Sequence, residues 1–352
     1  IILIIIGFVM LIKGADVLVF GASKIAKKLH ISEIVIGLTV VALGTTMPEL
    51  FVSIKSILSG STDISLGNVM GSNIFNLLVI IGFTAIVNPI PFERQTKLFD
   101  IPVTLGYMII FTLICNIGGN EIGLVKGIIL FAGVGTFIIY TVQMQKKFNK
   151  NGVGVGVPDD PANKGEESIV GQTDSCPIET TGDPSDGNES NVGVDASVRP
   201  NINNSMLKNI VYIIIGIVLL KLGGDFVVEN AIKIAKDLNI SEKIIGLTIV
   251  AFGTSLPELV TSVVACIKKE SGIAIGNVLG SNILNFFFVI GLAGIIKPIA
   301  FSNSYNFELG IIIASTLLFA LFARFNIKNK INRGHGVVFV FIYVAYVVMI
   351  WQ

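Results

Sequence analysis

The sequence has few charged residues, few histidines and few cysteines. Of its 352 residues 14% are charged, and the chain contains two His, three Cys and one Trp. Soluble domains are about a quarter charged, so this composition excludes an ordinary soluble globular chain. The net charge of +1 gives no strongly basic surface of the kind that binds nucleic acid. Cys115, Cys176 and Cys266 share no close spacing, which excludes the common zinc and disulfide patterns.

Apolar residues are abundant instead. They make up 52% of the chain, and the mean hydropathy is +0.80. Apolar runs near 20 residues recur along the chain, the length that spans a bilayer core of ~30 Å. We therefore expect an all-α polytopic membrane protein, surrounded by the lipid bilayer, with ten transmembrane helices. The expected spans are 1–22, 34–58, 64–87, 98–118 and 121–144, followed by 207–230, 243–267, 271–297, 305–325 and 334–352.

An internal repeat organises these spans. Adding 209 to a residue number in positions 14–89 gives a similar residue in the second half, without gaps. Between Ile36–Asn76 and Ile245–Asn285, 21 of 41 positions are identical. Because each half has an odd number of spans, the halves must cross the membrane in opposite senses. Such inverted repeats are typical of secondary transporters, so we expect two inverted five-helix repeats, 1–145 and 207–352, with broken helices 2, 3, 7 and 8.

The segment 146–206 joins the two repeats and differs from them in composition. Residues 151–206 contain ten acidic residues against Lys164 and Arg199. Such a segment buries too little apolar area to fold, so we expect an acidic, disordered linker. Fourteen Lys and Arg residues fall in the loops on the linker's side of the membrane and four in the opposite loops. The positive-inside rule then places the linker in the cytoplasm and both termini outside, in a protein of the cell membrane.

Each half carries the same motif in the middle of its second span. Residues 44–49 read GTTMPE, and residues 253–258 read GTSLPE. A carboxylate at the centre of a membrane helix costs ~2.5–3.5 kcal/mol on insertion scales, which indicates a functional role. A single copy is also compatible with a kinked helix and a protonated carboxyl, but two copies in register favour a shared site. Proline lacks an N–H and breaks the helix, so we expect free carbonyls around Ala42, Gly44 and Thr45.

The following span in each half adds glycine, serine and asparagine. Residues 67–76 read GNVMGSNIFN, and residues 276–285 read GNVLGSNILN. Ser72 and Asn76 are four apart, so they share one helical face. Carboxylate, hydroxyl, amide and carbonyl oxygens are the ligands of hard cations such as calcium and sodium. Glycines four apart allow close helix packing. Four further asparagines are expected either to bond helices or to support the ligands: Asn68, Asn73, Asn277 and Asn282.

Together the paired motifs resemble the two alpha-repeats of the sodium/calcium exchangers of the cation/calcium antiporter superfamily. The resemblance covers both membrane halves and implies ion sites between the second, third, seventh and eighth helices. It implies calcium ligands at Thr45, Glu49, Thr254 and Glu258. It also implies sodium-binding or central polar positions at Ala42, Thr46, Ser72, Asn76, Ala251, Ser255, Ser281 and Asn285.

Two details of the motifs indicate which ions are exchanged for calcium. Asn285 stands where potassium-dependent members have Asp, so the resemblance points away from potassium co-transport. The GT-x-x-PE pattern replaces the GN-x-x-E of proton/calcium exchangers, which favours sodium. We predict an antiporter that exchanges sodium for calcium by alternating access at a midplane site, working as a monomer without cofactor. A proton/calcium or other divalent-cation antiporter, and a cation channel, are the alternatives; no catalytic set indicates an enzyme.

Overall fold

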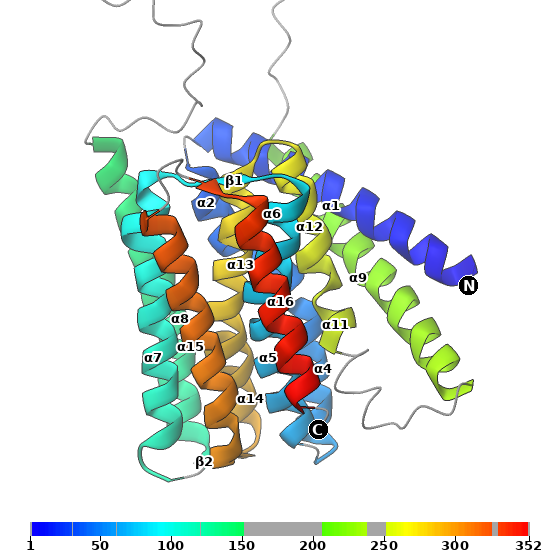
Figure 1. Ribbon diagram of the computed structural model, residues 1–352, viewed down its shortest axis with the longest axis vertical. Helices are drawn as coiled ribbons and strands as arrows, with labels where there is room; N and C mark the ends of the chain where they lie inside the picture. The colour runs from blue at the N-terminus through cyan, green and yellow to red at the C-terminus, as the bar shows by residue number, and fades with distance from the viewer. Residues whose placement is uncertain are drawn as a thin grey trace, which may run out of the picture.

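The predicted all-α membrane architecture is confirmed in the computed structural model (Figure 1). Among the described residues, eight helices are long and apolar enough to cross a membrane, and the bent pair Glu33–Thr45 and Met47–Leu58 makes a ninth if it is one span. The predicted span 243–267 is described only from Ala251 onward. The structure describes residues 2–29, 31–60, 62–119, 121–150, 206–237, 251–325 and 330–350. Of the predicted linker 146–206, only 146–150, which continue a helix, and Met206, which begins one, are among the described residues.

The first half follows the predicted order of spans. Its first, fourth and fifth spans are α1 (Ile2–Leu29), α7 (Ile101–Asn116) and α8 (Leu124–Lys150), with a π-helical turn η3 (Thr96–Asp100) before α7. The second span comprises α2 (Glu33–Ile36), the π-helical η1 (Gly37–Val41), α3 (Ala42–Thr45) and α4 (Met47–Leu58). The third comprises α5 (Thr62–Phe75), the π-helical η2 (Asn76–Ile80) and α6 (Ile81–Val87).

The second half repeats these elements in the same order. Its first span is α9 (Met206–Asp237), and the described part of the next is α11 (Ala251–Thr254) and α12 (Leu256–Ile267). Then come α13 (Ser271–Leu284), the π-helical η6 (Asn285–Val289) and α14 (Ile290–Ile296). The 3-10 turn η7 (Asn303–Tyr305), α15 (Asn306–Phe325) and α16 (Arg333–Ile350) complete the chain.

Two small sheets display the inverted symmetry. Strand β1 (Ile90–Pro91) pairs with β4 (Lys330–Ile331), and β2 (Glu121–Ile122) pairs with β3 (Ile299–Ala300). The offset of 209 relates β1 to β3 and β2 to β4, so each sheet joins one half to the other. Figure 1 places β1 at one end of the bundle and β2 at the other. The halves are therefore interleaved, and the repeat extends well beyond the positions at which the sequences match.

Glycines allow the closest contacts between helices of the two halves. A Cβ on Gly127 of α8 would lie 2.8 Å from the Ile295 backbone nitrogen and 2.9 Å from the Gly291 carbonyl of α14. The repeat-related pair, Gly336 of α16 and Gly82 of α6, makes the corresponding contact. Because these neighbours are backbone atoms, neither interface can accept a side chain unless its helices move apart.

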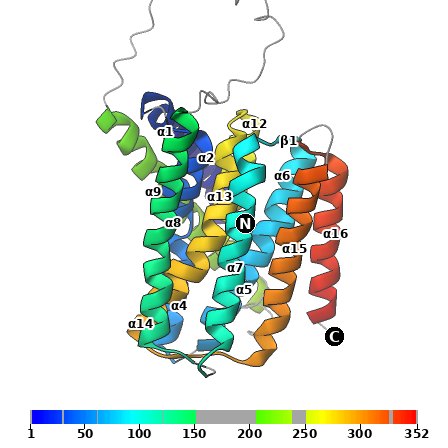
Figure 2. The same cartoon turned by 90° about the vertical axis from the view of Figure 1, so that its left-hand side faces the viewer.

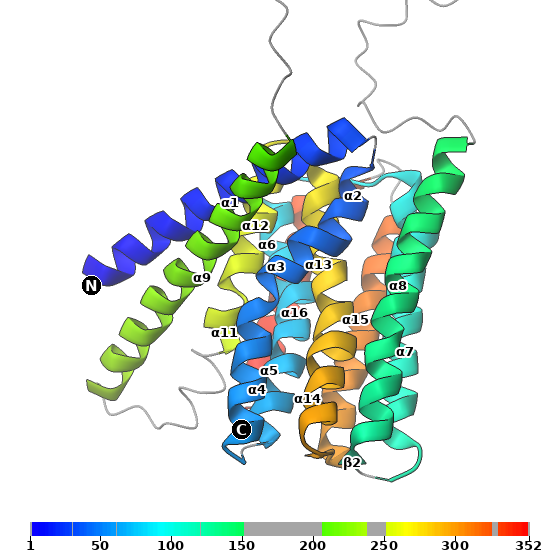
Figure 3. The same ribbon diagram turned by 180° about the vertical axis from the view of Figure 1, so that it is seen from behind.

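Helices α1 and α9 pack side by side along one flank and run at an angle to the others (Figures 1 and 3). A Cβ on Gly14 would lie 2.9 Å from Leu219 Cβ, and one on its repeat partner Gly223 would lie 2.7 Å from the Gly7 carbonyl. Seen from the side, α7 and α15 stand on the flank away from this pair (Figure 2). Helices α1 and α9 are therefore tightly packed against each other.

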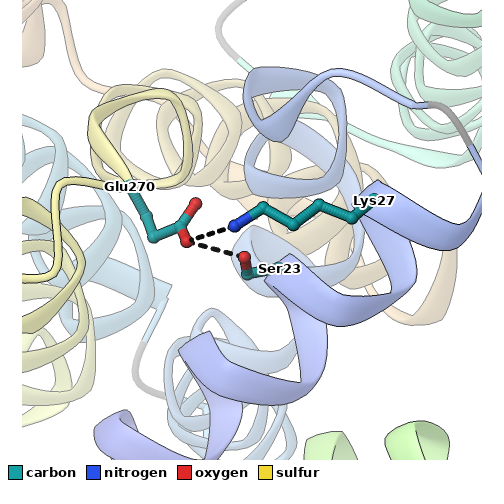
Figure 4. A network of polar contacts seen from close by, with 3 residues as sticks. All are labelled: Ser23, Lys27 and Glu270. Atoms are coloured by element: carbon teal, nitrogen blue, oxygen red, sulfur yellow. Dashed lines mark hydrogen bonds and ion pairs between the residues drawn. The ribbon is translucent and has the colours of Figure 1, made fainter. Parts of the chain in front are cut away.

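Polar contacts join α1 to the turn between α12 and α13. The Glu270 carboxylate accepts hydrogen bonds from Ser23 Oγ at 2.7 Å and Lys27 Nζ at 3.1 Å (Figure 4). Burial alone would raise the pKa of Glu270, but hydrogen bonds involving Glu33, Ser23 and Lys27 hold it below its usual value. This end of α1 is therefore attached to the second half by charge as well as by packing.

We predict that Gly127→Ala destabilises the fold. Its new methyl group would meet the α14 backbone, and overpacking of this kind costs about 1–3 kcal/mol. The matched control is Gly135→Ala in the same helix, where no described atom lies within 4 Å of the added carbon. The control should gain slightly from the higher helix propensity of Ala. Thermal unfolding in detergent should rank Gly127→Ala below the wild type and below Gly135→Ala; equal melting temperatures would contradict the packing assignment.

Candidate ion-binding site

The two predicted helix breaks lie at the centre of the bundle. The second span changes direction by 42° at Thr46, and α4 starts there with Pro48 in its first turn. In the second half the break falls at Ser255, and Pro257 lies in the first turn of α12. Proline is tolerated in a first turn because that turn needs no N–H partner. Each break therefore ends one short helix and begins another at the same depth.

The breaks place both acidic side chains at helix N-termini. Glu49 lies in the first turn of α4, and Glu258 lies in the first turn of α12. The positive end of a helix dipole stabilises a carboxylate there. The C-terminal ends of α3 and α11 meet the same region and carry the opposite partial charge. Half-helices that meet in this way form the ion sites of many transporters.

One expectation about the break is wrong. The Ala42 carbonyl is not free, because it accepts a hydrogen bond from the Thr46 N–H at 2.9 Å. This is the ordinary hydrogen bond of an α-helix, which continues as far as Thr46, so the break does not expose this oxygen. The Gly44 carbonyl is the one that faces the missing N–H of Pro48.

The structure buries the predicted site residues together. Glu49, Glu258, Ser255 and Asn285 have no exposed surface, and the most exposed of the described side chains, Thr254, is 6% exposed. The side chain of Ala251 lies outside the described parts. Buried together with Glu49 and Glu258 are Ala42, Thr45, Thr46, Ser72, Asn76, Thr254, Ser255, Ser281 and Asn285.

The two carboxylates lack a positive partner. Glu49 Oε1 accepts hydrogen bonds from Ser255 Oγ at 3.2 Å and Ser72 Oγ at 3.4 Å, while its Oε2 has no partner among the described residues. Neither oxygen of Glu258 has a hydrogen-bond partner in the described part of the chain. The negative charge of Glu49 acts directly on Glu258, and no Lys or Arg within the described ranges forms an ion pair with either.

Two asparagines contribute neutral oxygens to the same place. Asn76 and Asn285 each begin a π-helical turn in the middle of a span, η2 and η6. Single π turns inside α-helices are frequent at functional sites. The Oδ1 atoms of both side chains are buried and have no partner among the described residues. The third and eighth spans are thus interrupted by a change of helical type, without a sharp bend.

The unpaired atoms form an oxygen set suited to a hard cation. Together they are Glu49 Oε2, both carboxylate oxygens of Glu258, Asn76 Oδ1 and Asn285 Oδ1. Buried carboxylates without a counter-charge are strongly destabilising, and a bound cation removes that cost. Within the described ranges no group of three or more His, Cys, Asp or Glu side chains could hold a metal. Glu49 and Glu258 are the two carboxylates of this set, and its other oxygens are neutral.

The sequence leaves open the role of four further asparagines, which we call the outer asparagines: Asn68, Asn73, Asn277 and Asn282. The structure places them around this set of oxygens. Each accepts a hydrogen bond from a predicted site residue of the opposite half: Asn277 from Thr45, Asn68 from Thr254, Asn282 from Asn76 and Asn73 from Asn285. Thr46 also reaches across, donating to Ser281 Oγ at 3.2 Å. The repeat offset relates these contacts to one another in pairs, but which residues meet depends on how the two halves dock.

We expect calcium to stabilise the folded protein through these oxygens. Ligand at 100 times its Kd adds about 2.7 kcal/mol to the free energy of unfolding. In sodium-free, calcium-free buffer Glu258→Gln should melt above the wild type, because it removes the repulsion between the carboxylates. Calcium should then raise the melting temperature of the wild type and of Glu121→Gln, an exposed control in β2, but not of Glu258→Gln. An equal calcium shift in all three would contradict this assignment.

The chain is similar over its full length to known membrane transporters. It is 31% identical to the sodium/calcium exchanger MaX1 of Methanosarcina acetivorans, covering 99% of this chain and 97% of the relative. It is also 31% identical to the putative antiporter CaxA of Alkalimonas amylolytica, covering 98% and 96%. The inner membrane protein YrbG of Escherichia coli is 28% identical, with 99% and 96% covered.

Solved structures show the same fold. The sodium-calcium exchanger NCX_Mj, soaked with 2.5 mM Na+ and 0.1 mM Ca2+, superimposes with a TM-score of 0.74 at 28% identity, over 98% of this chain and 96% of the other. The same exchanger soaked with 2.5 mM Na+ and 1 mM Sr2+ gives a TM-score of 0.75. The family model described as sodium/calcium exchanger protein matches residues 1–143 and 208–352. The chain therefore belongs to the sodium/calcium exchanger family, as an integral membrane transporter.

Proposed function

We propose that the protein exchanges sodium for calcium across the cell membrane. The observation that carries the proposal is the pair of buried carboxylates, Glu49 and Glu258, which form no ion pair in the described chain. The amide oxygens of Asn76 and Asn285 are likewise buried and have no hydrogen-bond partner among the described residues. Such oxygens favour hard cations over zinc or copper. The printed names of MaX1 and NCX_Mj as sodium/calcium exchangers support the choice of ions.

In this proposal calcium and sodium occupy overlapping ligands. Calcium is bound by Thr45, Glu49, Thr254 and Glu258. Sodium uses the same carboxylates together with the neutral positions, so the two ions compete. The neutral positions assigned to sodium, or to the polar centre between the ions, are Ala42, Thr46, Ser72, Asn76, Ala251, Ser255, Ser281 and Asn285.

The charge of the site limits what one cycle can carry. Two carboxylates balance one calcium or two sodium ions. If a third sodium loads, it rests on neutral oxygens, and each cycle moves one net charge. A net charge is driven by about 2.3 kcal/mol per 100 mV of membrane potential. Transport by a three-to-one cycle would therefore respond to voltage, whereas a two-to-one cycle would not.

Alternating access follows from the inverted halves. We propose that repeats 1–145 and 207–352 are the two structural units, joined by the linker 146–206 in the cytoplasm, with both termini outside. In such transporters one bundle rocks against the other around a fixed central site. The oxygens of Glu49 and Glu258 come from different halves, so the site is complete only while the halves are together. One chain contains both halves, which is consistent with a monomeric transport unit.

The test is calcium-45 uptake into proteoliposomes under one ion gradient at a time. An outward sodium gradient should drive uptake, whereas equal potassium or proton gradients should not. Asn285 replaces the Asp of potassium-dependent members, and the GT-x-x-PE motif replaces the GN-x-x-E of proton/calcium exchangers. Glu49→Gln and Glu258→Gln should each abolish sodium-driven uptake by removing half of the charge that binds calcium.

The matched control for these variants is Glu121→Gln, an exposed substitution in β2 that should transport at the wild-type rate. Uptake driven by a pH gradient without sodium would instead identify a proton/calcium antiporter, and discrete single-channel currents would identify a channel. Full sodium-driven uptake by either glutamine variant would refute the site.

A further inference from the structure

The four outer asparagines, Asn68, Asn73, Asn277 and Asn282, form a second layer around the candidate ligands. We refer to them as the orienting asparagines. All four are buried, with at most 5% exposure. The offset of 209 relates Asn68 to Asn277 and Asn73 to Asn282. Each makes its contact across the interface between the halves, so the layer follows the inverted symmetry of the fold.

Two of them accept hydrogen bonds from threonine hydroxyls. Thr45 Oγ1 donates to Asn277 Oδ1 at 3.0 Å, and Thr254 Oγ1 donates to Asn68 Oδ1 at 3.1 Å. A hydroxyl has one hydrogen and two lone pairs. When the hydrogen points to an asparagine oxygen, it points away from any cation, and a lone pair of the threonine oxygen can face the ion.

The other two accept hydrogen bonds from asparagine amides. Asn76 Nδ2 donates to Asn282 Oδ1 at 3.0 Å, and Asn285 Nδ2 donates to Asn73 Oδ1 at 3.2 Å. An amide can rotate by half a turn and exchange its oxygen and nitrogen, so a fixed donor bond decides which atom faces the cavity. Here the Oδ1 atoms of Asn76 and Asn285 are left without a partner and remain available.

The orienting asparagines act mainly as acceptors. The Nδ2 atoms of Asn68, Asn73 and Asn282 have no partner among the described residues. Asn277 differs, because its Nδ2 donates to Ser262 Oγ at 3.0 Å and to the Glu258 carbonyl at 3.3 Å. The feature common to all four is therefore an oxygen that takes a hydrogen from a candidate ligand of the opposite half.

We propose that the orienting asparagines are positioning residues that turn ligand hydrogens away from the cavity, leaving oxygen alone to face the cation. The inference rests on the proposed site. This orientation explains how neutral side chains that carry both donors and acceptors can bind a cation. It also makes the orientation of each ligand depend on the opposite half, so the cation-ready arrangement requires the halves to be docked. Residues that orient metal ligands contribute about 10–100-fold in affinity.

The test compares two substitutions of Asn282 by calcium-45 binding to the purified full-length protein. Asn282→Leu has a similar shape but no acceptor, and should weaken calcium binding about 10-fold or more. Asn282→Asp has the same shape, keeps an acceptor for Asn76 Nδ2 and adds a negative charge, so it should bind calcium at least as tightly as the wild type. If Asn282 served only for packing, the two variants would lose calcium affinity to the same extent.

A double substitution separates orientation from general damage. In an Asn76→Ala background, Asn282→Leu should add less than about twofold, because the ligand that it orients is already absent. Thr104→Val, which removes a buried hydroxyl in α7 away from the site, is the control and should bind calcium normally. Wild-type affinity in Asn282→Leu, or losses that multiply in the double variant, would overturn the proposal. Failure of the wild type to bind calcium would instead count against the proposed function.

Discussion

The structure depends on two carboxylates buried without a positive partner in the described chain. Glu49 and Glu258 are fully buried, and the charge of one acts on the other. An uncompensated pair of this kind opposes folding, and a bound cation is the simplest compensation. Two helix breaks, two helix N-termini and a set of neutral oxygens converge on this pair. The rest of the bundle holds those parts in place.

The inverted repeat brings two copies of one short motif together at this pair of carboxylates. A single GT-x-x-PE segment would place one acid at a break, but the interleaved halves bring a second acid to it from the opposite direction. The glycine contacts of α8 on α14 and of α16 on α6 fix the helices that continue from Asn76 and Asn285. Six polar contacts at the centre cross between the halves, among them Ser255 to Glu49 and Thr46 to Ser281. A motion that separates the halves would therefore dismantle the site.

The sequence predicts the spans, the repeat and the burial of the site, because apolar length, the offset of 209 and the paired Pro-Glu motifs are local patterns. It predicts less about hydrogen bonding. The Pro-Glu motif predicts a free Ala42 carbonyl, but the α-helix continues to Thr46, whose N–H donates to that carbonyl. The π-helical turns that start at Asn76 and Asn285 have no clear sequence signature. The partner of each asparagine depends on how the halves dock, which periodicity does not encode.

The most direct measurement of the central claim is a competition isotherm on the purified protein. Bound calcium-45 would be followed at fixed free calcium as sodium replaces choline at constant ionic strength. A site shared through Glu49 and Glu258 predicts that sodium displaces calcium completely, and that higher calcium restores binding to the same one-ion maximum. Calcium binding that is unchanged by sodium, or a maximum that falls with sodium and is not restored by calcium, would contradict a shared pair of carboxylates.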